Sequence, residues 1–172
     1  MCAPSLTDGV VVLDGYVLAD VEAMVAGEDE EHARRFGWFP ARSTEETGRA
    51  AIERWQEQWR TDGSTRAFAV RENATGTFIG GCEIRISEAG VAAMSYWIFA
   101  FARRRGYATR AVALACDYAV ARLEIKLIEL HIAADNTASR GVARHAGFYQ
   151  DPGPARHGEL AADEVLYSRR FR

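Results

Sequence analysis

An arginine-rich turn between a predicted strand and a predicted helix constrains the fold of this chain more than any other feature. Residues 103–110 read Arg-Arg-Arg-Gly-Tyr-Ala-Thr-Arg. The run 92–101 ahead of them predicts a strand, and the residues behind them predict a helix from Tyr107 to about Leu123. Such a turn gathers free backbone N–H groups and the positive end of a helix dipole at one point. Three arginines alone would suit a solvated charge run, but this context predicts a cradle for an anion, best a phosphate-bearing cofactor.

The other predicted strands indicate a mixed sheet. They lie at 10–13, 66–71, 77–86, 126–134 and 164–171. The run of strands up to residue 101 predicts an antiparallel meander, with a hairpin loop at 72–76. The strand–helix–strand passage across 92–134 implies one parallel pair. We therefore expect an α+β fold with a mostly antiparallel sheet.

Helices are predicted both before and after this meander in the sequence. The first begins near Asp20, which is a good N-cap, and ends at Gly37. The second begins at a capping box in residues 43–46. A short helix after residue 134 is capped by Asp135 or Asn136.

Size, charge and cysteine content limit the possible functions. A chain of 172 residues predicts a single domain, 1–172. The net charge of −3 gives no reason to expect a nucleic-acid partner. No stretch approaches 18 apolar residues and no basic segment precedes an apolar run, so neither a membrane span nor a signal peptide is predicted. The three cysteines are too few and too scattered for a disulfide framework or a zinc site, so no metal is expected and a reducing cytoplasm fits.

Two sequence blocks resemble the GNAT superfamily of acetyl-CoA-dependent N-acetyltransferases. Arg103-x-x-Gly106-x-Ala108 is similar to the family signature Gln/Arg-x-x-Gly-x-Gly/Ala. The block Asp135-Asn136-Thr137-Ala138-Ser139, followed by the Gly-Phe at 147–148, resembles the family's Asn-x-x-Ser segment. The flanks, Ser95-Tyr96-Trp97-Ile98 and 105–109, are similar to the RimJ/RimL-like branch, which includes acetylases of ribosomal-protein N-termini. The resemblance covers roughly residues 66–170, and the first third fits more loosely.

This resemblance implies a fold, a cofactor and a reaction. The fold would be a GNAT-like twisted sheet, mostly antiparallel, flanked by helices, in which the one parallel pair splays apart. The cofactor would be acetyl-CoA, with its pantetheine arm between the splayed strands. The acetyl group would move to a primary amine by direct attack in a ternary complex. The amine would belong to a protein or peptide N-terminus or to a small molecule, and the sequence leaves a homodimer open.

The resemblance also implies which residues hold the cofactor. The pyrophosphate would lie on the N–H groups and side chains of the turn: Arg103, Arg104, Arg105, Gly106, Tyr107, Ala108 and Thr109. The pantetheine would pair with the backbone of Trp97, Ile98 and Ala100, and the N–H near Ile98 would polarise the thioester carbonyl. Asn136 would contact the pantetheine, although a plain helix cap explains it equally well and both can hold.

The catalytic residues are implied with alternatives. Ser139, also against the cofactor, would protonate the departing thiolate, or it is an ordinary helix hydroxyl. Glu83 is the first choice of general base, and the alternative is a surface carboxylate. His131 and Glu129 compete for that role, although a lone strand histidine is more often structural. Tyr149 and His157 are weaker candidates.

Two other functions are considered for the whole chain. A non-catalytic acyl-CoA-binding or regulatory module would need the same turn without an acid or base. A nucleotide-phosphate binder of another fold lacks support, since neither a Walker A motif nor a Gly-x-Gly-x-x-Gly fingerprint is present. The acidic clusters 28–31 and 45–46 hint at a cationic small-molecule acceptor.

Overall fold

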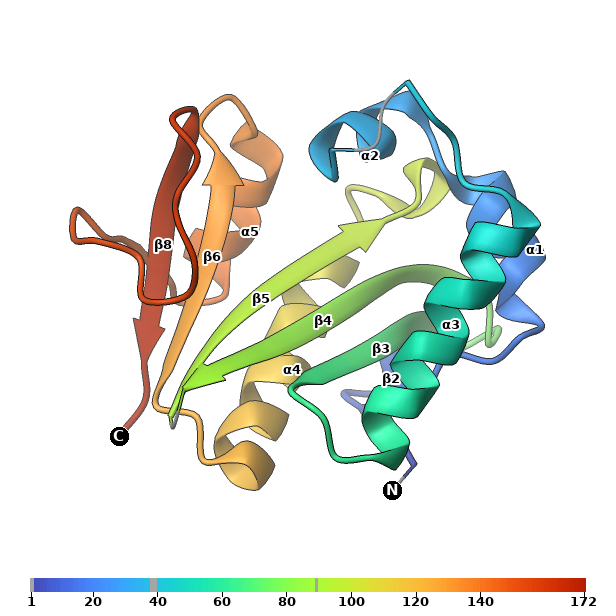
Figure 1. Ribbon diagram of the computed structural model, residues 1–172, viewed down its shortest axis with the longest axis horizontal. Helices are drawn as coiled ribbons and strands as arrows, with labels where there is room; N and C mark the ends of the chain where they lie inside the picture. The colour runs from blue at the N-terminus through green and yellow to red at the C-terminus, as the bar shows by residue number, and fades with distance from the viewer. Residues whose placement is uncertain (1, 38–39, 89) are drawn as a thin grey trace.

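A twisted eight-stranded sheet organises the computed structural model, which describes residues 2–37, 40–88 and 90–172 (Figure 1). The strand order is β1-β2-β3-β4-β5-β6-β8-β7. The strands are β1 (Leu6–Thr7), β2 (Val11–Asp14), β3 (Thr65–Glu72), β4 (Phe78–Glu88), β5 (Val91–Ile98), β6 (Leu127–Ala133), β7 (Tyr149–Gln150) and β8 (Glu164–Arg170). Only the β5–β6 pair is parallel among the paired strands described. The predicted mixed α+β fold is confirmed.

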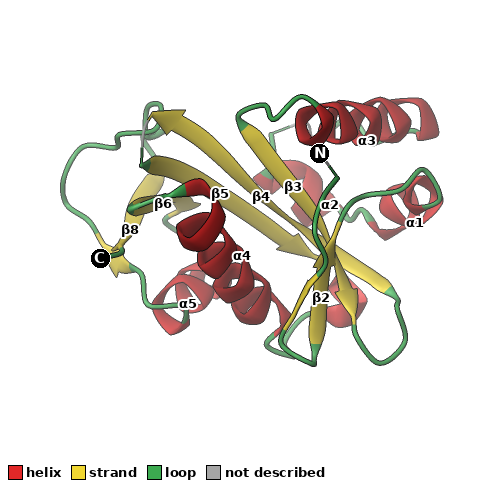
Figure 2. Ribbon diagram, turned by 90° about the horizontal axis from the view of Figure 1, so that it is seen from below, coloured by secondary structure: helices red, strands yellow, loops and turns green. Residues whose placement is uncertain are grey.

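Helices cover both faces of this sheet (Figure 2). They are α1 (Asp20–Gly27), α2 (Glu30–Arg35), α3 (Glu45–Arg60), the short 3-10 helix η1 (Ala100–Ala102), α4 (Tyr107–Leu123) and α5 (Thr137–His145). The helix α3 lies over the first strands, while α4 and α5 lie on the opposite face (Figures 1 and 2). No helix in the described ranges is long and apolar enough to cross a membrane.

The packing of α4 follows from its small residues. Ala111, Val112, Ala115 and Ala119 are each 0% exposed. Short side chains let a helix approach a sheet closely, because little volume separates the two backbones. Because α4 packs closely against the sheet, the position of its N-terminus is fixed, and so is that of the arginine-rich turn.

The parallel strands β5 and β6 separate after three residue pairs. Their register joins Val91 to Leu127, Ala92 to Ile128 and Ala93 to Glu129. Both strands continue beyond these pairs, and Figure 1 shows them diverging. From Met94 to Ile98, β5 therefore has a strand partner only on its β4 side. The predicted splay of the parallel pair is confirmed.

The predicted helix from Asp20 to Gly37 is wrong as a single helix. It is two helices, α1 and α2, and Glu28 between them is extended, with ψ 124°. Asp29 is also extended and accepts the N–H of His32 at 2.7 Å, so it caps a new helix. Asp20 is not an N-cap either. It is the first residue of α1, after Ala19, and its carboxylate binds the guanidinium of Arg71 through two hydrogen bonds.

Other predicted boundaries need smaller corrections. The strand predicted to reach residue 101 ends at Ile98, and η1 follows it. The capping box of α3 pairs Thr44 with Thr47 and does not begin at Ser43. The two-residue strands β1 and β7 have no sequence prediction, because such short strands carry no readable alternation. By contrast, α4 begins and ends as predicted.

Candidate functional site

The arginine-rich turn presents free N–H groups at the start of α4. Gly106 is the N-cap residue with φ 77°, and no side chain caps the helix. Arg104 also has a positive φ of 62°. The first hydrogen bond of the helix runs from the Arg110 N–H to the Gly106 oxygen at 3.2 Å. Within the described residues, the N–H groups from Arg104 to Thr109 donate no hydrogen bond. This geometry is that of an anion-binding helix N-terminus.

The three arginines of the turn play different structural parts. Arg103 is held in place: its Nε donates to the Ile98 oxygen at 3.0 Å, and its terminal nitrogens pair with Asp29 at 2.8 Å and Glu31 at 3.0 Å. It therefore ties the turn to α2. Arg104 and Arg105 are exposed, so these two guanidinium groups face solvent at the cradle.

The side chain of Tyr107 points into the protein. It is 8% exposed, and its hydroxyl donates to the carboxylate of Glu72. This hydrogen bond lowers the pKa of Glu72. Ala108 and Thr109 are partly buried in the first turn of the helix. For Tyr107, only the backbone N–H is therefore available to an anion at the cradle.

The open edge of β5 presents Ile98 and not its two neighbours. The Phe99 N–H donates to the Ile79 oxygen of β4 at 2.9 Å. Successive residues of a strand direct their N–H groups to opposite sides, so the N–H of Ile98 is directed toward the splay and that of Trp97 toward β4. Ala100 lies in η1 rather than in a strand, because β5 has ended.

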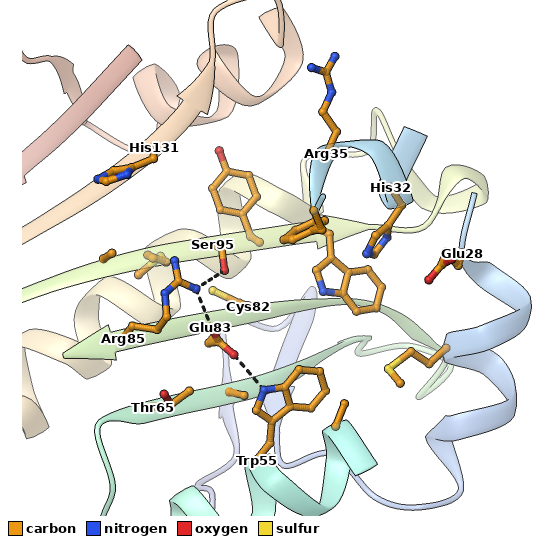
Figure 3. A pocket seen from close by; sticks show the side chains of 18 of the residues that line it. Glu28, His32, Arg35, Trp55, Thr65, Cys82, Glu83, Arg85, Ser95 and His131 are labelled. Atoms are coloured by element: carbon orange, nitrogen blue, oxygen red, sulfur yellow. Dashed lines mark hydrogen bonds and ion pairs between the residues drawn. The ribbon is translucent and has the colours of Figure 1, made fainter. Parts of the chain in front are cut away.

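A cavity of about 960 Å³ lies beside the splay, between helices α1 to α3 and the strands β3 to β6 (Figure 3). Its wall includes residues far apart in the sequence: Glu83, Tyr96, Trp97, His131, Asn136 and Ser139. All three predicted catalytic residues thus face one space. The residues of the turn, 103–109, do not line it, so cradle and cavity are separate parts of the surface.

Glu83 is held by two donors at the floor of the cavity. One carboxylate oxygen accepts the indole N–H of Trp55 at 2.9 Å, and the other accepts from Arg85 at 2.6 Å. The same Arg85 nitrogen donates to Ser95 Oγ at 2.9 Å (Figure 3). The Glu83 side chain is 23% exposed. Glu83 is therefore a fixed, partly buried carboxylate and not one on a solvated strand face.

Ser139 and Asn136 lie together at the start of α5. The Asn136 side-chain oxygen accepts the Ser139 N–H at 3.0 Å, which is a helix cap. The hydroxyl of Tyr96 lies 2.8 Å from Ser139 Oγ and 3.1 Å from the Ser139 backbone oxygen. Burial raises the pKa of Tyr96 to about 12, against the effect of its hydrogen bond with Ser139. A protonated phenol thus stands behind the serine hydroxyl.

Of the other candidate bases, two line the cavity and two do not. His131 lines the cavity from β6, and His157 lines it from the loop after β7. Glu129 does not line it: this carboxylate is 0% exposed and accepts the backbone N–H groups of Arg156 and His157 at 2.8 and 2.9 Å. Tyr149 is 76% exposed on β7 and also lies outside the cavity wall.

Three residues of the site carry no sequence prediction of function. Tyr96 lies within the run quoted for the family resemblance, and Arg85 stands two residues from Glu83 on the same strand face. In the sequence, Trp55 recurs at helical spacing with Gly48, Ile52 and Trp59, a pattern typical of core packing. Its indole does stack on Tyr16, at 4.4 Å between ring centroids. Only the tertiary structure shows that its N–H reaches Glu83.

Known proteins place this fold in one family. The sequence matches the acetyltransferase (GNAT) domain over residues 11–149. This match begins well before residue 66, so it includes most of the N-terminal third. Among curated proteins, no sequence matches this chain.

Solved structures with the same fold include several acetyltransferases. RimJ of Mycobacterium smegmatis, in complex with a CoA disulfide, is 21% identical with a TM-score of 0.77, over 98% of this chain and 86% of that one. The microcin C7 self-immunity acetyltransferase MccE, in complex with acetyl-CoA and AMP, is 16% identical with a TM-score of 0.79, over 96% and 94%. RimL, the ribosomal L7/L12 alpha-N-protein acetyltransferase, in complex with coenzyme A, is 15% identical with a TM-score of 0.78, over 94% of each chain.

These likenesses are low in sequence identity and extend over nearly the whole chain, so they establish a common fold. The match over residues 11–149 covers most of the sequence and includes the strand, turn and helix around Gly106. The chain belongs to the GNAT acetyltransferase family.

Proposed function

We propose that this protein transfers an acetyl group from acetyl-CoA to a primary amine, using Glu83 as base and Ser139 with Tyr96 as the proton donor. One observation carries the proposal: Glu83 and Ser139 face the same cavity, beside the gap between β5 and β6. GNAT acetyltransferases use acetyl-CoA, and the known structures of MccE and RimL hold acetyl-CoA and coenzyme A.

The chain fits this cofactor on features of its own backbone. The free N–H groups from Arg104 to Thr109 suit a pyrophosphate, since they lie together at the start of α4 and the helix dipole adds positive charge there. Arg104 and Arg105, which are both exposed, add positive charge beside these groups, and Arg105 also lies 4.0 Å from the carboxylate of Glu72. The unpaired edge of β5 from Met94 to Ile98 offers hydrogen bonds to the amide groups of a pantetheine arm. Asn136, which caps α5, lines the same space.

Each step of the transfer then has a residue. Bound acetyl-CoA would supply the thioester carbonyl and a thiolate leaving group. The N–H of Ile98 donates to the carbonyl oxygen, where negative charge develops. Glu83 accepts the proton of the attacking amine, directly or through a water. Ser139 would donate its hydroxyl proton toward the thiolate and recover one from Tyr96 at 2.8 Å. Tyr96 would regain its proton from water, and Glu83 would release the amine proton to water, before the next turnover.

The acceptor belongs to one of two classes. RimL acts on the α-amino group of a ribosomal protein, and by analogy a peptide N-terminus would enter the cavity here. A cavity of about 960 Å³ also accommodates a small amine. Both acceptors need the same Glu83 and Ser139.

The test is release of free thiol from acetyl-CoA in the presence of a panel of peptides and small amines. We expect turnover with at least one amine, and a loss of about 100-fold or more in kcat for Glu83→Gln. Glu53→Gln, an exposed position on α3, is the matched control and should keep full activity. Binding of acetyl-CoA without turnover of any amine would instead indicate an acyl-CoA-binding module.

A further inference from the structure

We infer that the acceptor amine carries a carboxylate, which Arg85, His131 and His157 bind at the end of the cavity where β5 and β6 begin to separate. This inference rests on the proposed function, since it names the substrate class of the same site. It comes from the unused hydrogen-bonding groups at that end and from the charges of the cavity wall.

These side chains meet because of the sheet register. Arg85 of β4 is paired with Ala93 of β5, and Ala93 is paired with Glu129 of β6. Laterally paired residues place their side chains on one face of a sheet, and so does His131, two residues beyond Glu129. The small Ala93 leaves room above the sheet between the longer side chains. Figure 3 shows Arg85 rising from β4 toward β5, with His131 on β6 beyond it.

The groups with unused hydrogen-bonding capacity at this end are nitrogens: a guanidinium, which only donates, and two imidazole nitrogens, which donate in the tautomer that places the proton on them. His131 Nε2 and His157 Nδ1 are buried and have no hydrogen-bond partner in the described part of the chain. Arg85 donates only through Nη1, to Glu83 and Ser95, within the same residues. A buried polar atom without a partner is costly, so a ligand that satisfies these atoms is favoured.

The neighbouring carboxylates are already occupied. The two oxygens of Glu83 accept from Trp55 and Arg85. Those of Glu129 accept two backbone N–H groups and the guanidinium of Arg156 at 3.3 Å. The free nitrogens of Arg85, His131 and His157 therefore need an oxygen acceptor from a ligand. A carboxylate offers two such oxygens in one plane.

His157 is held firmly enough to take part in binding. The backbone N–H of His157 donates to the buried carboxylate of Glu129 at 2.9 Å, and the backbone N–H of Arg156 donates to it at 2.8 Å. The loop after β7 is thus anchored to the centre of the sheet. A hydrogen-bonding group on an anchored backbone loses little entropy on binding.

The charge of the cavity wall agrees with an anionic acceptor. Four arginines line it, Arg35, Arg42, Arg54 and Arg85, against three glutamates, Glu28, Glu83 and Glu164. Arg42 and Arg54 form no ion pair among the described residues. Arg35 pairs with Asp135, which lies outside the wall, and Arg85 pairs with Glu83. Arg42 and Arg54 are therefore the arginines of the wall that are left to attract an anion.

The acidic run 28–31 does not change this balance, although it suggested a cationic acceptor from sequence. Glu30 pairs with Arg34 at 2.6 Å, and Glu31 pairs with Arg103 at 3.0 Å. The expectation of a cationic acceptor rested on residues 28–31 and 45–46, and of these residues Glu28 alone lines the cavity. The inferred acceptor has the opposite charge.

The test compares acceptors that differ by one charge. Ala-Asp-Gly-amide is paired with Ala-Asn-Gly-amide, and glycine with glycinamide, at saturating acetyl-CoA. We expect kcat/KM to favour the carboxylate by about tenfold or more in at least one pair. Preference within the peptide pair places the carboxylate on the second residue of a peptide, and preference for glycine places it next to the amine.

Variants assign this preference to the three residues. His131→Gln and His157→Gln should each reduce the preference to about threefold or less, while the exposed helix variant His145→Gln should leave it unchanged. Arg85→Gln also removes a hydrogen bond to Glu83 and so lowers the rate with every acceptor. Its effect is therefore judged from the ratio of kcat/KM for the two acceptors of a pair. A wild-type ratio near one, or a ratio that both histidine variants retain, would overturn the inference.

Failure of the transferase proposal gives a different result. If no amine is acetylated, the same peptides are titrated calorimetrically into protein saturated with coenzyme A. Tighter binding of the aspartate peptide, lost in His131→Gln, keeps the carboxylate site although the catalytic proposal fails. Equal binding of the two peptides would reject the carboxylate site as well.

Discussion

At the scale of single residues, the proposed chemistry depends on side chains that hold other side chains. Trp55 and Arg85 fix the two oxygens of Glu83, and Tyr96 stands behind Ser139. A carboxylate or hydroxyl held in this way pays less entropy when it meets the reacting atoms. The positions of Glu83 and Ser139 therefore depend on their supporting residues as well as on the backbone.

The Tyr96–Ser139 contact leads to a prediction at this scale. Tyr96→Phe removes the hydroxyl that lies 2.8 Å from Ser139 Oγ, and we expect kcat to fall by about tenfold or more. If the two hydroxyls act as one unit, the double variant Tyr96→Phe, Ser139→Ala should be no slower than Ser139→Ala alone. Steady-state kinetics with one amine tests this. Losses that simply multiply would show that the two hydroxyls act independently.

At the scale of elements, the strand β5, the turn and α4 form the side of the proposed site where acetyl-CoA would bind. The open N-terminus of α4 and the open edge of β5 meet at η1, because β5 ends at Ile98 and not at residue 101. Arg103 links this assembly to α2. The turn thus combines one arginine that holds elements together with two that are exposed.

This division predicts different effects for two arginine variants. Arg105→Ala should raise KM for acetyl-CoA about tenfold and leave the free energy of unfolding nearly unchanged, since the side chain is 59% exposed. Arg103→Ala should lower the free energy of unfolding by about 1 kcal/mol, because a network of partly buried ion pairs is lost. Urea unfolding and initial rates measured on both variants provide the comparison. The same effect on KM and stability in both variants would contradict the division.

A second prediction at this scale concerns the end of α1. A Cβ on Gly27 would lie 2.2 Å from the ring of Phe99, so Gly27→Ala should destabilise the fold by about 1–3 kcal/mol. Gly141 in α5 is the control, because a Cβ there meets nothing within 4 Å. Gly141→Ala should stabilise by up to about 1 kcal/mol, since alanine favours a helix. Thermal unfolding of both variants measures this. Equal stability of the Gly27 variant and the wild type would show that Phe99 moves aside.

At the scale of the whole molecule, two histidines make stability depend on pH. Burial lowers the pKa of His32, and burial together with the charge of Arg85 and nearby His131 lowers that of His157. The unfolded chain, with the ordinary value of about 6.5, then takes up protons before the folded one. The contribution of these two histidines to the free energy of unfolding is therefore fully present above about pH 6.5, and it is lost as the pH falls below that value.

The measurement is the urea midpoint at pH 7.5 and at pH 5.5. We expect a lower midpoint at pH 5.5, and a smaller difference between the two in His32→Gln and in His157→Gln. The exposed control His145→Gln should keep the wild-type difference. A midpoint that does not change between the two pH values in the wild type would contradict the argument.

Much of this architecture can be predicted from local sequence. The helix α4, the meander and the parallel pair follow from apolar periodicity, turn glycines and the strand–helix–strand rule. The splay of that pair was implied by the family resemblance. The failures share a cause. The predicted helix through residue 28 breaks because Asp29 caps a second helix, and Phe99 lies against Gly27 from a distant part of the chain. Periodicity within a segment carries no record of such partners.

By itself, the sequence determined the arginine-rich turn and its open helix N-terminus, since glycine at positive φ and the start of a helix are local properties of the chain. Only the tertiary structure decided which functional groups face each other. The contacts of Glu83 with Trp55, of Ser139 with Tyr96 and of His157 with Glu129 span 28, 43 and 28 residues. Such contacts depend on sheet register and helix packing, which bring distant residues together only when the whole core forms.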